Sequence, residues 1–371
     1  MSDDEVTGPT LPTAQPIRLI DERGEPAPRE RAAGFAMPEA GILLDLYRRM
    51  VLARRFDVQV TALTRQGRLA TYPSGLGQEA CEIAAAAALA DDDWLFPTYR
   101  DSIALLARGV TVVEILSFFR GDWHSGFNPK QRRIAPQSTP LATQALHAVG
   151  FATASKMRHE PVATLAFLGD GATSEGEAHE AFNFAAVWQT PTVFVVQNNG
   201  YAISVPFSKQ SHARTLADKA IGYGMPGHFV DGNDVAAMYA VITDALDRAR
   251  NGGGPALIEG LTYRMEAHTN SDDPSRYRDD DEVERWRSLD PIARIESYLI
   301  REGVLTEGLR AEIADAAEQL AAETRDAMNE SPHLNPLELF DHVYATPRTA
   351  LAEQRDYLAT ELESSEARHL S

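Results

Sequence analysis

The sequence predicts an α/β protein with a doubly wound, mainly parallel sheet and helices on both faces of the sheet. Two observations lead to this prediction. Short apolar runs alternate with longer segments of helical periodicity from residue 79 to residue 262. The runs are rich in Val, Phe and Leu without polar alternation, which is typical of strands buried on both faces. No repeat or low-complexity block interrupts this order.

The N-terminal residues 1–38 contain six prolines and scattered charges. This composition predicts an extended arm, either disordered alone or draped over a partner. Residues 39–284 form the predicted α/β domain, and residues 285–371 a charged, mainly helical region that we expect to pack on the same domain. We expect helices at 41–66, 79–89, 141–157, 174–187 and 236–249, and strands at 94–96, 162–168, 192–196, 229–230 and 256–262.

Polar residues follow two of these strands, and their spacing indicates that they lie close together in the fold. Gly169-Asp170-Gly171 ends the first, and Asn198-Asn199 ends the second after 26 intervening residues, 172–197. A strand–helix–strand unit of this length makes the strands parallel, so Asp170 and Asn199 should lie at the same edge of the sheet. Ligands of open α/β sheets bind at that edge. Two side-chain oxygens beside a helix N-terminus suit Mg²⁺ bridging a diphosphate.

Composition limits the classes of partner. The formal charge of −19 argues against nucleic acid and anionic membrane surfaces; it suits a basic partner surface but is also common among acidic proteins. The single cysteine, Cys81, excludes an internal disulfide and should be a packed core residue. No apolar run approaches the roughly 18 residues that cross a bilayer. The first residues lack signal- or transit-peptide features, so we expect a cytoplasmic protein.

Residues 169–204 (GDGATSEGEAHEAFNFAAVWQTPTVFVVQNNGYAIS) resemble the thiamin diphosphate motif of one family, the α subunits of the decarboxylase component of 2-oxo acid dehydrogenase complexes. The likeness extends from about residue 46 to about residue 351. It includes Tyr99-Arg100, residues 138–144 (STPLATQ) and residues 263–277 (YRMEAHTNSDDPSRY). The resemblance implies the thiamin diphosphate-binding fold and oxidative decarboxylation of a 2-oxo acid, with acyl transfer to a lipoyl group.

The resemblance also assigns roles to residues. It implies that Mg²⁺ binds Asp170, Asn199 and the backbone carbonyl of Tyr201, and that His268 lines the channel in which the substrate and the lipoyl group react. Histidine there suits proton transfer or stabilisation of charge. Leu141 would hold the cofactor bent. The cofactor contacts implied are Tyr99, Arg100, Thr139, Leu141, Gly169, Asp170, Gly171, Ala172, Asn199, Tyr201, Ile203 and His268. In branched-chain members, the positions of Ser138, Pro140, Thr143 and Gln144 bind a potassium ion.

Plainer explanations exist for single residues: a surface salt bridge between Arg100 and Asp101, an ordinary loop histidine at 268, and a core leucine at 141. Two other protein classes also fit parts of the sequence. A non-catalytic homologue should have lost at least one of the matched residues, and all are present. A nicotinamide-binding Rossmann enzyme needs G-x-G-x-x-G, but Ser174 stands at the last position.

The family resemblance implies partners as well. In the family, the glutamate that activates the cofactor lies on a separate polypeptide, and we find no second domain of that kind in this sequence. We therefore expect an obligate β subunit, an α2β2 assembly and a lipoyl-bearing acyltransferase. The segments NNGYAIS and VDGNDV favour branched-chain 2-oxo acids as substrate. Pyruvate and acetoin remain alternatives.

Overall fold

The chain folds into two compact units, Met1–Asn329 and Glu330–Ser371. The computed structural model describes residues 11–122, 125–330, 334–341 and 343–369. The helical region expected from residue 285 onwards is thus divided between the two units at Asn329. The second unit contains η5 (Pro336–Phe340) and α13 (Thr349–His369), which contact each other.

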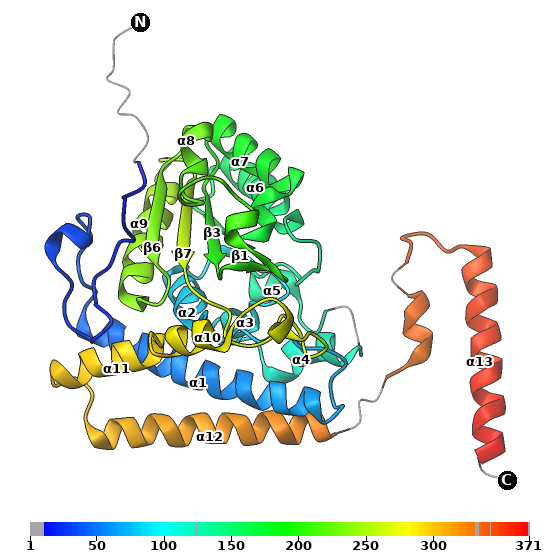
Figure 1. The fold of residues 1–371 in the computed structure, drawn as a ribbon. Helices are drawn as coiled ribbons and strands as arrows, with labels where there is room; N and C mark the ends of the chain where they lie inside the picture. Colours follow the sequence, from blue (N-terminus) through cyan, green and yellow to red (C-terminus); the bar gives the residue numbers. More distant parts are fainter. Residues whose placement is uncertain (1–10, 123–124, 331–333, 342, 370–371) are drawn as a thin grey trace, which may run out of the picture. The chain divides into compact units, whose positions relative to one another are not determined.

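A five-stranded, wholly parallel sheet forms the centre of the first unit, in the order β1-β2-β3-β7-β6 (Figure 1). This confirms the predicted parallel α/β architecture. The last strand along the sequence, β7, lies inside the sheet between β3 and β6. The strands are β1 (Trp94–Phe96), β2 (Thr164–Gly169), β3 (Thr192–Asn198), β6 (Gly227–Asp231) and β7 (Ala256–Leu261).

Both faces of the sheet are buried, because successive strand residues contribute to different apolar clusters. Leu165 and Phe167 of β2 belong to one cluster, which α2 and α9 cover, while Ala166 and Leu168 belong to another, which α6 and α7 cover. This alternation explains why the strands are apolar throughout. The covering helices are α2 (Glu79–Ala88), α9 (Val235–Arg250), α6 (Thr143–Met157) and α7 (Gly176–Trp188).

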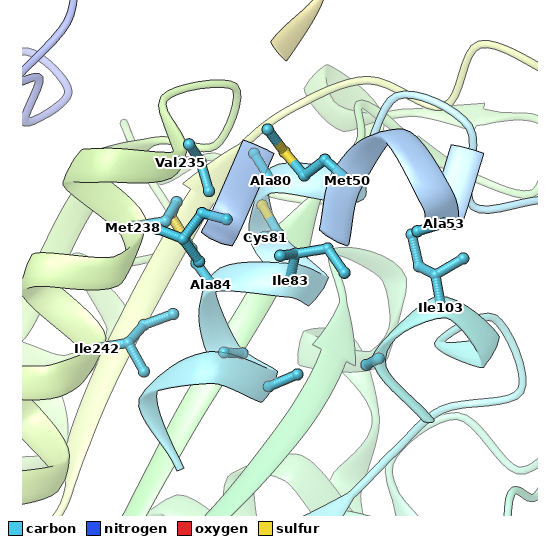
Figure 2. Packing of buried hydrophobic residues seen from close by; sticks show 14 of the residues in the cluster. Met50, Ala53, Ala80, Cys81, Ile83, Ala84, Ile103, Val235, Met238 and Ile242 are labelled. Carbon is cyan, nitrogen blue, oxygen red and sulfur yellow. The ribbon is translucent and has the colours of Figure 1, made fainter. Parts of the chain in front are cut away.

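Small residues allow α2 to pack closely between its neighbours. Figure 2 shows Cys81 of α2 between Met50 of α1 and Met238 of α9. Cys81 is fully buried, and a Cβ added at Gly260 would lie 2.8 Å from its sulfur. Burial raises the pKa of the Cys81 thiol well above its ordinary value. Cys81 is therefore a packed core residue, as the sequence predicted.

An outer helical layer covers α2 (Figure 1). In this layer α1 packs against both α11 and α12. Leu299 of α11 and Ile313 of α12 belong to the core. The three helices are α1 (Ala40–Arg65), α11 (Pro291–Arg301) and α12 (Glu307–Asn329).

The N-terminal segment lies against its own domain from residue 11 onwards. Ile17 pairs with Val230 beside the edge strand β6, donating a hydrogen bond to Phe229 and accepting one from Asp231. The backbone N–H groups of Leu19 and Ile20 both donate to the buried carboxylate of Asp234. Residues 17–20 therefore cover the edge of β6 and contribute to the core of this chain.

The remaining elements are short, and the sequence analysis predicted none of α3, α4, α5, α8, β4 and β5. The start of α4 is fixed by a capping box, in which Thr111 and Glu114 each bind the other's backbone N–H. Among the described residues, no helix is long and apolar enough to cross a membrane. The short elements are α3 (Ser102–Ala107), α4 (Val112–Arg120), α5 (Pro129–Arg132), α8 (Lys219–Tyr223), α10 (Asp280–Arg287), β4 (Tyr201–Ala202), β5 (Val205–Pro206), η1 (Arg29–Arg31), η2 (Gly171–Ser174), η3 (Phe207–Lys209) and η4 (Pro274–Arg276).

Candidate functional site

A cavity opens at the carboxyl ends of four parallel strands. The segments after β1, β2, β3 and β7 each contribute to its wall, as expected for an open α/β sheet. Eleven of the predicted site residues line it: Tyr99, Arg100, Leu141, Gly169, Asp170, Gly171, Ala172, Asn199, Tyr201, Ile203 and His268. The lining also includes Gln78, Thr98, Leu168, Gln197, Ala202 and Arg264, which the sequence analysis did not single out.

The sheet register brings Asp170 and Asn199 together. Gly169 of β2 pairs with Gln197 of β3, so the two polar residues leave neighbouring strands at the same edge. Both are buried, with 2% and 6% of their surface exposed. Oδ2 of Asp170 accepts a hydrogen bond from Gln210 Nε2 at 2.6 Å, and burial raises the pKa of the Asp170 carboxyl. A bound cation would favour its charged form.

Gly171 permits close contact between the turn after β2 and Ala202. A Cβ at this position would lie 2.7 Å from the Cβ of Ala202, closer than side-chain carbons approach each other. Ala202 belongs to β4, which pairs with β5 in a small antiparallel hairpin beside the cavity. The glycine therefore lets the turn after β2 lie directly against this hairpin.

Arg100 is a buried residue and not a surface ion-pair partner of Asp101. Only 6% of its surface is exposed, and its guanidinium donates to the carbonyl oxygens of Ser74 (2.9 Å) and His268 (3.2 Å). The guanidinium carbon also lies 5.6 Å from the centre of the Tyr99 ring. The surface salt bridge considered as an alternative is therefore excluded.

His268 is held between two arginines. Its Nδ1 lies 3.1 Å from Arg100 Nη2 and 2.9 Å from Arg264 Nη1. A guanidinium can only donate, so Nδ1 accepts and the ring proton resides on Nε2. Burial, together with the positive charges of Arg100 and Arg264, lowers the pKa of His268 to about 4. At neutral pH this imidazole is uncharged and offers an N–H donor.

Arg264 was missed by the sequence analysis, although it is the largest fully buried side chain of the described residues. It follows β7 and donates to the carbonyl of Ile203 (2.7 Å) and to the hydroxyl of Tyr277 (3.1 Å). Burial lowers the pKa of Arg264 to about 10, so it stays charged at neutral pH. The sequence signal that could have identified Arg264 was a single basic residue shortly after a buried strand.

Two aliphatic side chains of the cavity lining are exposed. Leu141 is 37% exposed and Ile203 is 52% exposed. Ile203 also has a positive φ of 56°, which is unfavourable for a β-branched residue. Its carbonyl is held by Arg264, which compensates for that conformation. Apolar surface in such a position suits contact with the ring of a ligand.

Only part of the segment 138–144 lies at the cavity. Within the described chain, the cavity lining does not include Thr139, which is exposed, nor Ser138, Pro140 or Thr143. Gln144 is buried, and its Nε2 donates to the carbonyls of Leu141 (3.1 Å) and Phe167 (2.8 Å). Its Oε1 is buried without a hydrogen-bond partner among the described residues. The structure thus leaves an acceptor beside the cavity wall.

The described residues contain no group of three or more His, Cys, Asp or Glu side chains that could hold a metal ion. The metal-binding capacity of the cavity rests on Asp170 and on the amide and carbonyl oxygens beside it. One carboxylate with neutral oxygens suits Mg²⁺ bound together with phosphate, because Mg²⁺ retains several non-protein ligands.

Comparison with known proteins agrees with this geometry. The family model described as "Dehydrogenase E1 component" matches residues 47–337. The chain is 47% identical over 348 residues to the 3-methyl-2-oxobutanoate dehydrogenase subunit alpha of Mycobacterium tuberculosis, covering 94% of each chain. It is 38% identical to the 2-oxoisovalerate dehydrogenase subunit alpha of Bacillus subtilis, covering 85% of this chain and 98% of the relative.

A third relative carries a different name. The pyruvate dehydrogenase E1 component subunit alpha of Acholeplasma laidlawii is 39% identical, covering 91% of this chain and 95% of the relative. All these likenesses extend along nearly the whole sequence. The chain belongs to the dehydrogenase E1 component family.

Proposed function

We propose that this chain is the α subunit of a thiamin diphosphate-dependent dehydrogenase of branched-chain 2-oxo acids. Its assembly would transfer the acyl group to the lipoyl group of an acyltransferase component. The observation that carries the proposal is the meeting of Asp170, Asn199, Arg100 and His268 in one cavity. The 47% identity to a 3-methyl-2-oxobutanoate dehydrogenase subunit supports the choice of substrate.

The cavity fits the diphosphate half of the cofactor. Asp170, Asn199 and the carbonyl of Tyr201 would hold Mg²⁺, and Tyr99 and Arg100, which line the same cavity, would bind phosphate oxygens. Gly169, Gly171 and Ala172 offer backbone without bulky side chains. When bound, thiamin diphosphate supplies the carbon that adds to the ketone and the ring that accepts the electrons left by carbon dioxide.

The remaining cavity residues would orient the cofactor and donate hydrogen bonds to the substrate. Leu141 and Ile203 present apolar surface to the rings of the cofactor. His268 is uncharged at neutral pH and would donate its Nε2–H to the substrate carboxylate or to the developing acyl oxygen. Its neutral form suits hydrogen-bond donation from Nε2 better than the donation of a proton from imidazolium, because Nδ1 already accepts from the two arginines.

Gln144 supports a potassium site next to the cavity. Its unpartnered Oε1 is a neutral oxygen of the kind that large monovalent cations bind, and burial without a partner costs about 1–3 kcal/mol. Ser138, Pro140 and Thr143 would supply further oxygens, in agreement with the resemblance to branched-chain members.

A β subunit is needed to complete the site. Among the described residues that line the cavity, Asp170 is the one carboxylate, and it is assigned to the metal. The acid that the pyrimidine ring of the cofactor requires must then come from another polypeptide. We therefore include an α2β2 heterotetramer in the proposal, with the cofactor between α and β.

The test is co-expression with a candidate β subunit. Decarboxylation of 3-methyl-2-oxobutanoate and of pyruvate, and cleavage of acetoin, would be compared with and without thiamin diphosphate and Mg²⁺. We expect the branched acid to be turned over fastest, and Asp170→Ala to lose metal-dependent cofactor binding. Asp45→Ala, an exposed carboxylate on α1, is the control and should behave as the parent does.

Two outcomes would change the proposal. Faster turnover of pyruvate would assign the activity named for the Acholeplasma relative, which is 39% identical. Absence of metal-dependent cofactor binding in the assembled complex would contradict the proposal as a whole.

A further inference from the structure

A chain of hydrogen bonds connects a buried carboxylate to Asn199. Oδ1 of Asp101 accepts from Gln197 Nε2 at 2.6 Å, and Gln197 Oε1 accepts from Gln78 Nε2 at 2.8 Å. Gln78 Oε1 in turn accepts from Asn199 Nδ2 at 2.9 Å. All four residues are buried, with between 0% and 6% of their surface exposed. They come from three segments that meet only in the folded protein.

The groups at the two ends of this row of hydrogen bonds determine the direction in which its amides donate. A side-chain amide has one donating and one accepting end, so three linked amides can run in either of two directions. The carboxylate of Asp101 accepts at both oxygens, because Oδ2 takes the N–H of Thr98 at 2.6 Å. At the far end, the backbone N–H of Tyr201 can only donate, and it donates to Asn199 Oδ1 at 3.2 Å. Both ends therefore favour the same direction.

We infer that Asp101, Gln197 and Gln78 are positioning residues that fix which atom of Asn199 is available to a metal ion. The inference rests on the proposed function, in which Asn199 is a ligand of Mg²⁺. With Nδ2 committed to Gln78, the oxygen is the end of the Asn199 amide that can bind a metal, because it has a second lone pair besides the one that accepts from Tyr201. Each hydrogen bond in the row also polarises the next one, which makes that terminal oxygen a better electron donor.

The opposite direction would place a nitrogen where the metal needs an oxygen. If residue 101 could donate, Gln197 and Gln78 could both turn over and Asn199 could follow. Nδ2 of Asn199 would then face the N–H of Tyr201 and the metal, where it binds neither. A neutral Asn at position 101 allows this reversal, because it cannot accept from both Thr98 and Gln197.

The experiment measures metal affinity directly in the complex with the β subunit. Mn²⁺ would be titrated at saturating thiamin diphosphate, with free Mn²⁺ followed by electron paramagnetic resonance. Outer-shell partners of metal ligands typically contribute 10- to 100-fold to affinity, so we expect Asp101→Asn to weaken Mn²⁺ binding by roughly that factor. Gln78→Met should do the same, and since it changes no charge, its effect cannot be a loss of negative potential.

Asp234→Asn is the matched control for loss of a buried carboxylate. Asp234 is fully buried like Asp101 and accepts from backbone N–H groups, but it does not line the cavity. Its variant should retain the parent's Mn²⁺ affinity within about 3-fold, even though it loses thermal stability.

The possible results separate this inference from the function on which it rests. If the parent complex itself binds no Mn²⁺ with the cofactor, the proposed function fails. If the parent binds but Gln78→Met and Asp101→Asn bind equally well, the row of amides has only a structural role and the inference is overturned. Equal weakening by Asp234→Asn would overturn it too. Should Asp101→Asn not fold, Gln78→Met decides alone.

Discussion

Arg264 and His268 share a hydrogen bond that determines which imidazole nitrogen carries the proton. Nη1 of Arg264 lies 2.9 Å from Nδ1 of His268, and a guanidinium has no lone pair to accept with. His268 therefore presents Nε2–H to the cavity.

Replacing Arg264 should raise the pKa of His268. In the parent protein that pKa is lowered to about 4, so His268 should produce no change in kcat/KM between pH 5 and 8. Arg264→Met removes one of the two positive charges that lower it, so the pKa should rise part of the way toward its ordinary value of about 6.5, while burial and Arg100 keep it below that value. As the pH falls through the raised pKa, the ring becomes protonated and kcat/KM should fall at a higher pH than in the parent. The measurement is the pH profile of the enzyme assembled with β.

Arg276→Met is the control for this prediction, because Arg276 is an exposed arginine on the same loop. Its profile should match that of the parent. An acidic limb near pH 6.5 in the parent that His268→Asn abolishes would show that the two arginines do not hold the ring neutral.

A methyl group at Gly171 should destabilise the protein. Its Cβ would lie 2.7 Å from the Cβ of Ala202, and overpacking of this kind typically costs about 1–3 kcal/mol. Gly150→Ala in α6 is the matched control, since an added Cβ there meets nothing within 4 Å. It should gain about 0.5–1 kcal/mol from helix propensity. Urea unfolding of both variants measures the difference, and equal stabilities would refute the contact.

Arg54 should be indispensable for the packing of α1 against α2. It donates to Glu79 at 2.7 Å and also to Asp290, while Glu79 is fully buried. Arg54→Met leaves that carboxylate unpaired, a change that typically costs about 3–5 kcal/mol. Arg55→Met breaks the neighbouring exposed pair with Glu318 and should cost less than about 1 kcal/mol. Similar free energies of unfolding for the two variants would contradict the assignment.

His228 should make stability depend on pH. Burial lowers the pKa of His228 to about 4, against about 6.5 in the unfolded chain. Between these values the unfolded state binds more protons, so the contribution is fully present above about pH 6.5 and is lost as the pH falls toward 4. His228→Phe, which keeps an aromatic ring next to Phe35, should flatten that slope. The test is the difference in unfolding free energy between variant and parent across this range.

The sequence was sufficient to predict which edge of the sheet carries the cavity and that Asp170 and Asn199 lie together there. The spacing from Asp170 to Asn199 contains a strand–helix–strand unit, and such units have one handedness and a common edge. The observed pairing of Gly169 with Gln197 follows from it. Periodicity also identified α6, α7 and α9, because each buries one face against the sheet, whereas α2 is buried on all sides.

The contacts around that pair could not be predicted, for two physical reasons. Asp101, Gln197 and Gln78 are far apart in sequence, and neither charge nor periodicity distinguishes a linked glutamine from an exposed one. Arg264 has the composition of a surface residue and is buried only because Ile203 and His268 receive its hydrogen bonds. Positive φ at Ile203 is likewise a product of tertiary contacts, since sequence alone would favour Gly or Asn there.

The position of β7 inside the sheet has a consequence for synthesis on the ribosome. β3 and β6 are made first, yet they become neighbours of one strand that is completed only at Leu261. Until then both present open edges, which are the surfaces through which nascent chains associate wrongly. Arg264 and His268 emerge later still, so the lining of the cavity is not complete until about three quarters of the chain has been translated.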